Sequence, residues 1–172
     1  MTVEHNPEDI ETLEALLALQ AALADGRQSD PALEIQRGVG RLMRTLGHAH
    51  IMELTLANGR RADVVALTTA GEIWIIEIKS SVEDFRADHK WPEYWDYADV
   101  VLFAVAPGFP VDILPEGAGL ILADRYGGEL VRLPAEQRLA PARRRAMLLN
   151  FARTAALRLA SAIDPSLTRG IG

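Results

Sequence analysis

The sequence predicts an α/β domain in which helices flank a mixed central β-sheet. Three apolar runs, residues 51–56, 61–67 and 73–79, are separated by short glycine-containing breaks, a pattern typical of antiparallel strands joined by tight turns. A fourth run, residues 100–106, is apolar throughout and follows a helical pattern, which predicts a parallel strand reached through a crossover helix. Helical periodicity before and after these runs completes the prediction.

Length and composition predict one globular domain, because 172 residues with 49% hydrophobic content can form a substantial core. The formal net charge is −6, so any contact with DNA must come from a local basic patch. There is no cysteine, which excludes disulfides, thiolate zinc sites and a cysteine nucleophile. We expect a cytoplasmic protein without a membrane segment, because no apolar run approaches the roughly 18 residues that span a bilayer.

Three segments are expected along the chain. Residues 1–29 form an N-terminal leader in which the Ala- and Leu-rich residues 8–24 are either a helix, with a stripe at Leu13, Leu16, Leu17 and Ala21, or mobile. Residues 30–165 form the α/β domain, which opens with a helix capped at Asp30-Pro31 and closed near Gly47. Residues 166–172 are expected to be a disordered tail.

The first two strands are predicted to pair through a two-residue Asn58-Gly59 turn. In that register Leu54 faces Asp63, while Glu53 points away and is not a ligand. The next two strands are predicted to pair through a three-residue loop at residues 69–71, which places Asp63 opposite Glu77.

Charged residues in the strand at residues 73–79 are the main indication of function. Glu77 and Lys79 share one face of a strand that is apolar on both faces, and burying them is unfavourable without partners or a metal. Asp63 is expected on the same face. Adjacent carboxylates repel each other unless a cation lies between them, and Mg²⁺ is typically held by one or two carboxylates. A lysine beside such a metal can orient the water that attacks a phosphodiester.

The motif formed by Asp63 and then Glu77-Ile78-Lys79 resembles the signature of the PD-(D/E)xK nuclease superfamily. The longer run E-I-K-S-S-V-E-D-F-R-A-D-H-K-W-P-E-Y resembles the MmcB-like DNA repair family of bacteria, with similarity over roughly residues 30 to 160. One departure is Ala62, which stands where the superfamily motif has proline.

The resemblance implies a restriction-endonuclease-like core and a Mg²⁺- or Mn²⁺-dependent deoxyribonuclease that acts in DNA repair. It implies metal ligation by Asp63, Glu77 and the main-chain carbonyl of Ile78, with Lys79 as the residue that positions water. It also implies a further catalytic glutamate on the first helix, for which Glu34 is the candidate; the alternative is a solvated residue in the first helical turn. The implied partners are branched, gapped or single-stranded DNA and other repair proteins.

A helix is predicted to begin near Val82 behind a capping box and to run towards Trp91-Pro92. Its carboxylates, Asp84 and Asp88, are expected on a solvated face. Arg86 and Lys90 are either exposed or phosphate contacts. Four aromatic residues follow this helix: Trp91, Tyr94, Trp95 and Tyr97. We expect their side chains either to belong to the hydrophobic core or to form a platform on which bases stack.

Two short edge strands, residues 119–123 and 129–133, and a long helix over residues 141–163 are expected to complete the domain. The run Arg143, Arg144 and Arg145 near the start of this helix is either a solvated face or a phosphate-binding site.

Two alternatives to an active nuclease remain open from the sequence. In the first, the domain is a catalytically weak or inactive module that binds DNA structures or docks onto a repair partner. In the second, the domain is purely structural and Lys79 forms ion pairs with Asp63 and Glu77.

Overall fold

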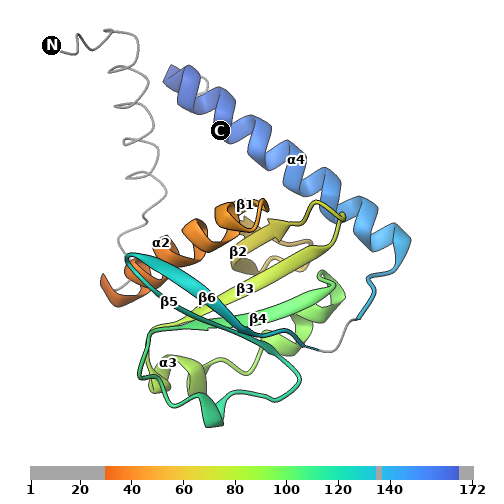
Figure 1. Ribbon diagram of the computed structural model, residues 1–172. Coiled ribbons are helices and arrows are strands. Elements are labelled where there is room, and N and C mark those ends of the chain that lie inside the picture. Colours follow the sequence, from red (N-terminus) through yellow and green to blue (C-terminus); the bar gives the residue numbers. More distant parts are fainter. Residues whose placement is uncertain (1–29, 135–136, 167–172) are drawn as a thin grey trace, which may run out of the picture. The chain divides into compact units, whose positions relative to one another are not determined.

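A computed structural model describes residues 30–134 and 137–166 and contains one mixed six-stranded sheet (Figure 1). The strands lie in sequence order, β1-β2-β3-β4-β5-β6. Strands β1 to β3 form an antiparallel meander, β3 to β5 are parallel, and β6 returns antiparallel to β5. The strand bounds are β1 Ala49–Thr55, β2 Arg61–Leu67, β3 Ile73–Lys79, β4 Val100–Val105, β5 Gly119–Asp124 and β6 Gly127–Arg132. The predicted mixed α/β sheet is therefore confirmed.

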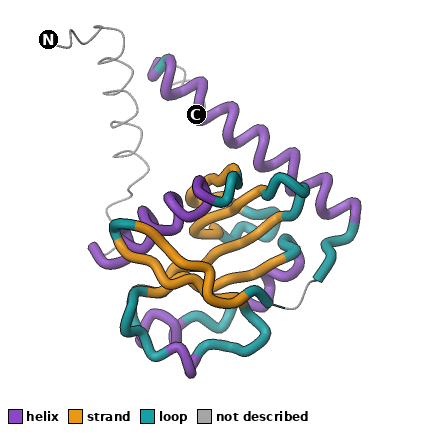
Figure 2. The backbone as a smooth tube through the Cα atoms, viewed as in Figure 1, coloured by secondary structure: helices purple, strands orange, loops and turns teal. Residues whose placement is uncertain are grey.

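Helices connect and cover these strands, as the colouring by secondary structure shows (Figure 2). The α-helices are α2 Asp30–Thr45, α3 Val82–Ala87 and α4 Pro141–Ile163, and the 3₁₀ helices are η1 Trp91–Asp96 and η2 Val111–Ile113. The start of α2 and the span of α4 agree with the helices predicted from the sequence. No helix in the described ranges has the length and apolar character needed to cross a membrane.

Helix α2 packs on one face of the sheet. Its buried residues Ile35, Val39 and Met43 belong to one core cluster with even-numbered residues of the central strands, such as Val64 and Ile76. At Gly38 the helix approaches the β5–β6 turn so closely that a Cβ atom would lie 2.2 Å from the Asp124 carbonyl oxygen. Only glycine fits this contact between backbones.

The opposite face of the sheet carries a second core cluster. Phe103 on β4 makes edge-on ring contacts with Phe85 of α3 and Trp91 of η1, with centroids 5.5 and 5.6 Å apart. Since strand side chains alternate between faces, the odd-numbered Glu77 and Lys79 of β3 project to this side, away from α2.

The predicted register of the first hairpin is wrong by one residue. The Leu56 amide donates to the Arg60 carbonyl at 2.7 Å, so the turn has three residues, and Leu54 pairs with Ala62. The Asn58 side chain accepts from the Arg60 amide at 3.1 Å and stabilises this longer turn. Glu53 is consequently the residue opposite Asp63, and it adopts a left-handed backbone with φ of 52° that interrupts the ladder.

The predicted register of the second hairpin is confirmed. The Thr68 amide donates to the Glu72 carbonyl at 3.0 Å across a three-residue loop that ends at Gly71, with φ of 82°. Val64 pairs with Ile76, so the next position brings Asp63 to Glu77.

The crossover between β3 and β4 contains a shorter helix than predicted. Helix α3 begins at Val82, with the Ser81 hydroxyl accepting from the Asp84 amide, but it ends at Ala87. Asp88 has an extended backbone and its carboxylate accepts from the Lys90 amide at 2.9 Å. The chain continues as the 3₁₀ helix η1, with Pro92 in its first turn, where the missing amide proton costs no helical hydrogen bond.

The chain divides into two units, residues 29–151 and a second unit composed of residues 1–28 and 152–172. Helix α4 extends from the first unit into the second, of which residues 152–166 are described. The predictions for the leader, residues 1–29, and for residues 167–172 of the tail lie outside the described residues.

Candidate active site

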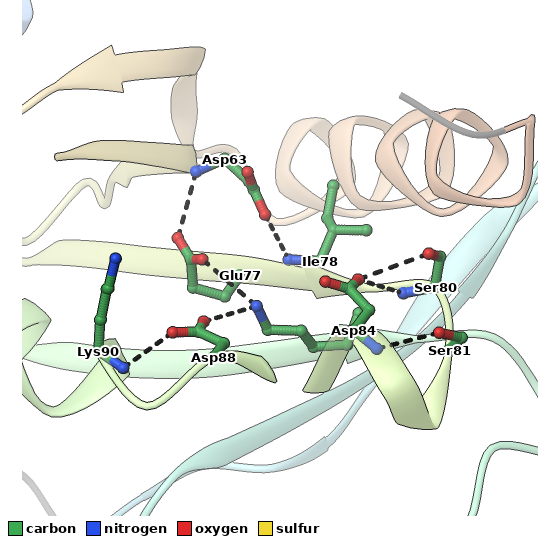
Figure 3. A network of polar contacts seen from close by, with 9 residues as sticks. Asp63, Glu77, Ile78, Ser80, Ser81, Asp84, Asp88 and Lys90 are labelled. Carbon is green, nitrogen blue, oxygen red and sulfur yellow. Dashed lines mark hydrogen bonds and ion pairs between the residues drawn. The ribbon is translucent and has the colours of Figure 1, made fainter. Parts of the chain in front are cut away.

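Asp63 and Glu77 meet where β2 and β3 separate (Figure 3). The Asp63 amide donates to Glu77 Oε1 at 3.3 Å, and the Ile78 amide donates to Asp63 Oδ2 at 2.8 Å. Each carboxylate thus accepts a hydrogen bond from a backbone amide of the neighbouring strand, as a main-chain carbonyl would in a regular sheet. Two acidic side chains are held next to each other by the backbone of adjacent strands.

Lys79 extends from the same strand into this cluster. Its Nζ lies 3.9 Å from Glu77 Oε2 and 2.6 Å from Asp88 Oδ2, and its side chain is only 6% exposed. Asp88 reaches Lys79 because α3 ends one residue before it. The prediction that Asp88 is solvated is therefore wrong, since its carboxylate is the main partner of a buried ammonium.

Burial and charge together set the protonation of the cluster. Burial, followed by the neighbouring charge of Asp63, raises the pKa of Glu77 to about 8. Burial likewise raises the pKa of Asp63, although the Ile78 amide opposes this rise. Burial lowers the pKa of Lys79, but the hydrogen bond that Lys79 donates to Asp88 and the charge of Glu77 outweigh this effect and raise the pKa overall. The cluster therefore combines a charged Lys79–Asp88 pair with a Glu77 carboxyl group that keeps its proton to a higher pH than an exposed glutamate.

Tyr94 is a member of this site that sequence reasoning missed. Its side chain is buried on η1, and its hydroxyl interacts with the Glu77 carboxyl group. Burial, together with the charges of Glu77 and Asp63, raises the pKa of the Tyr94 hydroxyl. The sequence predicted a core or base-stacking position for the aromatic residues of this segment, because no local pattern shows that η1 turns this hydroxyl towards β3.

Glu34 is placed apart from the other predicted catalytic residues. Its carboxylate forms an ion pair with Arg125 in the β5–β6 turn, at 2.5 Å. Helix α2, which carries Glu34, covers the face of the sheet opposite to Glu77 and Lys79. The structure therefore brings together Asp63, Glu77 and Lys79, and it does not bring Glu34 to them.

The segment that follows Lys79 carries Arg86 and Lys90, for which the sequence predicted either simple exposure or phosphate contact. Asp84 accepts from the Ser80 amide at 3.2 Å, which fixes the turn into α3. Arg86 and Lys90 are both exposed on this segment, one within α3 and one just after Asp88. Both side chains are therefore accessible to solvent on the segment that connects β3 to η1.

The arginine run at the start of α4 is divided between different roles. Arg144 binds the buried Asp99 through both guanidinium nitrogens, one of them at 2.8 Å, and donates to the Gly71 carbonyl at 2.7 Å. Arg144 is therefore structural, and it serves neither of the two roles predicted for this run, a solvated face or a phosphate-binding site. Arg143 pairs with the exposed Asp96, while Arg145 is exposed.

The oxygen atoms of this cluster meet only part of what a divalent cation such as Mg²⁺ requires. Asp63 and Glu77 supply two neighbouring carboxylates, the usual number for Mg²⁺, and the repulsion between them is what a cation would relieve. In residues 30–134 and 137–166, no group of three or more His, Cys, Asp or Glu side chains is arranged to hold a metal. A cation here would therefore depend on the two carboxylates, a main-chain carbonyl such as that of Ile78, and water.

Glu53 is a further carboxylate close to the cluster. Its side chain is 10% exposed and forms an ion pair with Arg61 at 3.5 Å, and its charge contributes to the raised pKa of Asp63. The register predicted for the first hairpin put Glu53 away from the site, and the observed register, which differs by one residue, brings Glu53 opposite Asp63.

Comparison with known proteins provides a family and a structural relative. A solved structure of a protein of unknown function from Silicibacter pomeroyi is 43% identical, with a TM-score of 0.77, and the match covers 84% of this chain and 97% of that one. No curated protein matches the chain. The sequence profile of the DNA repair protein MmcB-like family matches residues 19–166. The chain that carries this carboxylate and lysine cluster therefore belongs to the MmcB-like family of DNA repair proteins.

Proposed function

We propose that this protein is a DNA endonuclease that hydrolyses phosphodiester bonds at the Asp63–Glu77–Lys79 cluster with Mg²⁺ or Mn²⁺. The observation that carries this proposal is the convergence of two carboxylates from adjacent strands, with a lysine ammonium 3.9 Å from one of them. The DNA repair family makes DNA the expected polymer. The proposal includes membership of the PD-(D/E)xK superfamily with its restriction-endonuclease-like core.

Asp63 and Glu77 would hold the metal together with the Ile78 carbonyl. The bound ion supplies a Lewis acid that polarises the phosphate and makes a water molecule more acidic. Glu77 must lose its proton to become a ligand, and its neighbours decide how readily this happens. Asp63 opposes ionisation of Glu77, whereas Lys79 and the Asp63 amide favour it.

Lys79 stays protonated through its bond to Asp88, so it acts as a charged hydrogen-bond donor rather than as a base. A buried ammonium beside Glu77 can orient the attacking water and stabilise the negative charge that develops on the phosphate. Tyr94 interacts with the Glu77 carboxyl group from the side of η1. Exposed Arg86 and Lys90 would bind the DNA backbone next to the scissile bond.

A second candidate is an inactive or weakly active module that binds DNA structures or a repair partner. The observation that favours it is the position of Lys79, which is almost wholly buried and bound to Asp88 at 2.6 Å. If the Lys79 ammonium stays bound to Asp88, it cannot contact the water molecule that would attack the DNA phosphate. The two candidates therefore differ in whether the Lys79 ammonium takes part in turnover.

Nicking assays on branched, gapped and single-stranded DNA separate these candidates. We expect cleavage that requires Mg²⁺ or Mn²⁺ and is lost in Asp63→Asn and Lys79→Ala, while the exposed Glu83→Gln on α3 retains it as a matched control. DNA binding by Lys79→Ala, measured by fluorescence anisotropy, shows that the variant remains folded and competent. DNA binding without cleavage by the unmodified protein on every substrate, with either metal, would favour the binding module.

A further inference from the structure

The last turns of α4 present an apolar stripe to solvent. Ala152, Ala156, Leu159 and Ile163 recur at spacings of four, three and four residues, which places them on one side of the helix. All four are exposed, and the exposed fractions of Leu159 and Ile163 are 59% and 77%. A stripe with this spacing is typical of a helix that packs against another helix.

The charge of α4 is of one sign. The last turns of α4, residues 152–163, contain two arginines, Arg153 and Arg158, and no acidic residue. A second copy of α4 packed on this stripe would bring like charges together, which disfavours a symmetric pair of these helices. The partner that suits the stripe is an acidic amphipathic helix.

The chain itself contains such a segment. Residues 1–25 carry six acidic residues and no lysine or arginine. The chain has 24 acidic and 18 basic residues, so the remaining 18 acidic residues balance the 18 basic ones, and residues 1–25 account for the whole net charge of −6. Within this region, residues 8–24 combine Glu8, Glu11 and Glu14 with an apolar stripe of leucine and alanine.

We propose that residues 8–24 dock as a helix on the exposed stripe of α4 in the same molecule. The leucine side chains of the segment would cover Leu159 and Ile163, and its glutamates would lie beside α4 arginines such as the exposed Arg153. Both the apolar surface and the charge of α4 are then compensated within one chain. This docking is independent of any nuclease activity.

Hydrogen exchange of the full-length chain, followed by mass spectrometry, tests the docking. We expect the amides of residues 8–24 to exchange at least tenfold more slowly than an unstructured peptide of the same sequence. Leu159→Gln should abolish this protection. Leu157→Gln should preserve it, because Leu157 is equally exposed, at 56%, but lies on another side of α4. Since both substitutions introduce the same residue on one helix, they form a matched pair.

Three results would overturn the proposal. The first is exchange of residues 8–24 at the unprotected rate, and the second is equal protection in Leu159→Gln and the unmodified chain. The third is protection that disappears on tenfold dilution, because it would show that a second copy supplies the segment. Unchanged circular dichroism of both variants confirms that α4 remains helical.

Discussion

Ionisation of Glu77 should make this protein less stable as the pH rises from about 5 to 8. The perturbation that isolates this effect is Glu77→Gln, which keeps the shape of the side chain and removes its charge. In the folded state burial and Asp63 raise the pKa of Glu77 from 4.5 to about 8. The folded protein therefore retains a proton that the unfolded chain loses in this range, and the free energy of unfolding must fall as pH rises.

The magnitude follows from the two pKa values. Each pH unit between 4.5 and 8 lowers the free energy of unfolding by about 1.4 kcal/mol, so the full range corresponds to an effect on the order of 5 kcal/mol. Asp63 adds to the same trend, because burial raises its pKa as well. Asp88 does not contribute in this range, since its pKa is lowered and it is ionised in both states above about pH 5.

Urea denaturation at half-unit steps from pH 5 to pH 8.5, with EDTA present, measures the slope directly. We expect a steep decline for the unmodified protein, a much flatter curve for Glu77→Gln, and a decline equal to that of the unmodified protein for Glu83→Gln. Mg²⁺ should stabilise the unmodified protein more at pH 8 than at pH 5.5 if Asp63 and Glu77 bind it. Parallel curves for the unmodified protein and Glu77→Gln would show that Glu77 is not desolvated as the structure places it.

Three further substitutions test other parts of the structure by urea denaturation. Arg144→Ala should destabilise the fold by about 3 to 5 kcal/mol, because the buried Asp99 loses its charge partner, whereas Arg145→Ala should change stability by less than about 0.5 kcal/mol. Gly38→Ala should cost at least about 2 kcal/mol, because the new methyl group would collide with backbone oxygens of the β5–β6 turn. Asp88→Asn should cost about 3 kcal/mol, because it leaves a buried ammonium without its carboxylate. Similar stability of Arg144→Ala and Arg145→Ala would refute the structural role assigned to Arg144.

The distribution of charge changes how the net charge should be understood. A value of −6 for the whole chain gives no sign of nucleic-acid binding, but residues 26–172 are neutral overall. The acidic excess lies in one terminal segment, and basic residues such as Arg86, Lys90 and Arg145 lie on the described domain. Charge summed over a whole chain therefore conceals local patches of opposite sign.

The sequence alone determined the sheet, most helix bounds and the pairing of Asp63 with Glu77. These features follow from local rules, namely strand periodicity, capping residues and the three-residue loop that ends at Gly71. The same rules failed at Asn58-Gly59, where the asparagine side chain stabilised a longer turn and shifted the register.

Only the tertiary structure decided which side chains surround the carboxylates. Asp88 and Tyr94 reach β3 because α3 ends early and η1 turns back towards the sheet. The periodicity of the sequence does not show which way the backbone continues after a helix ends. Glu34 pairs with Arg125 and Arg144 pairs with Asp99. These partners are distant in the sequence, so local patterns do not show the pairing. Local propensity fixes the elements of this protein, whereas the partners of its charged groups depend on contacts between residues that are distant in the chain.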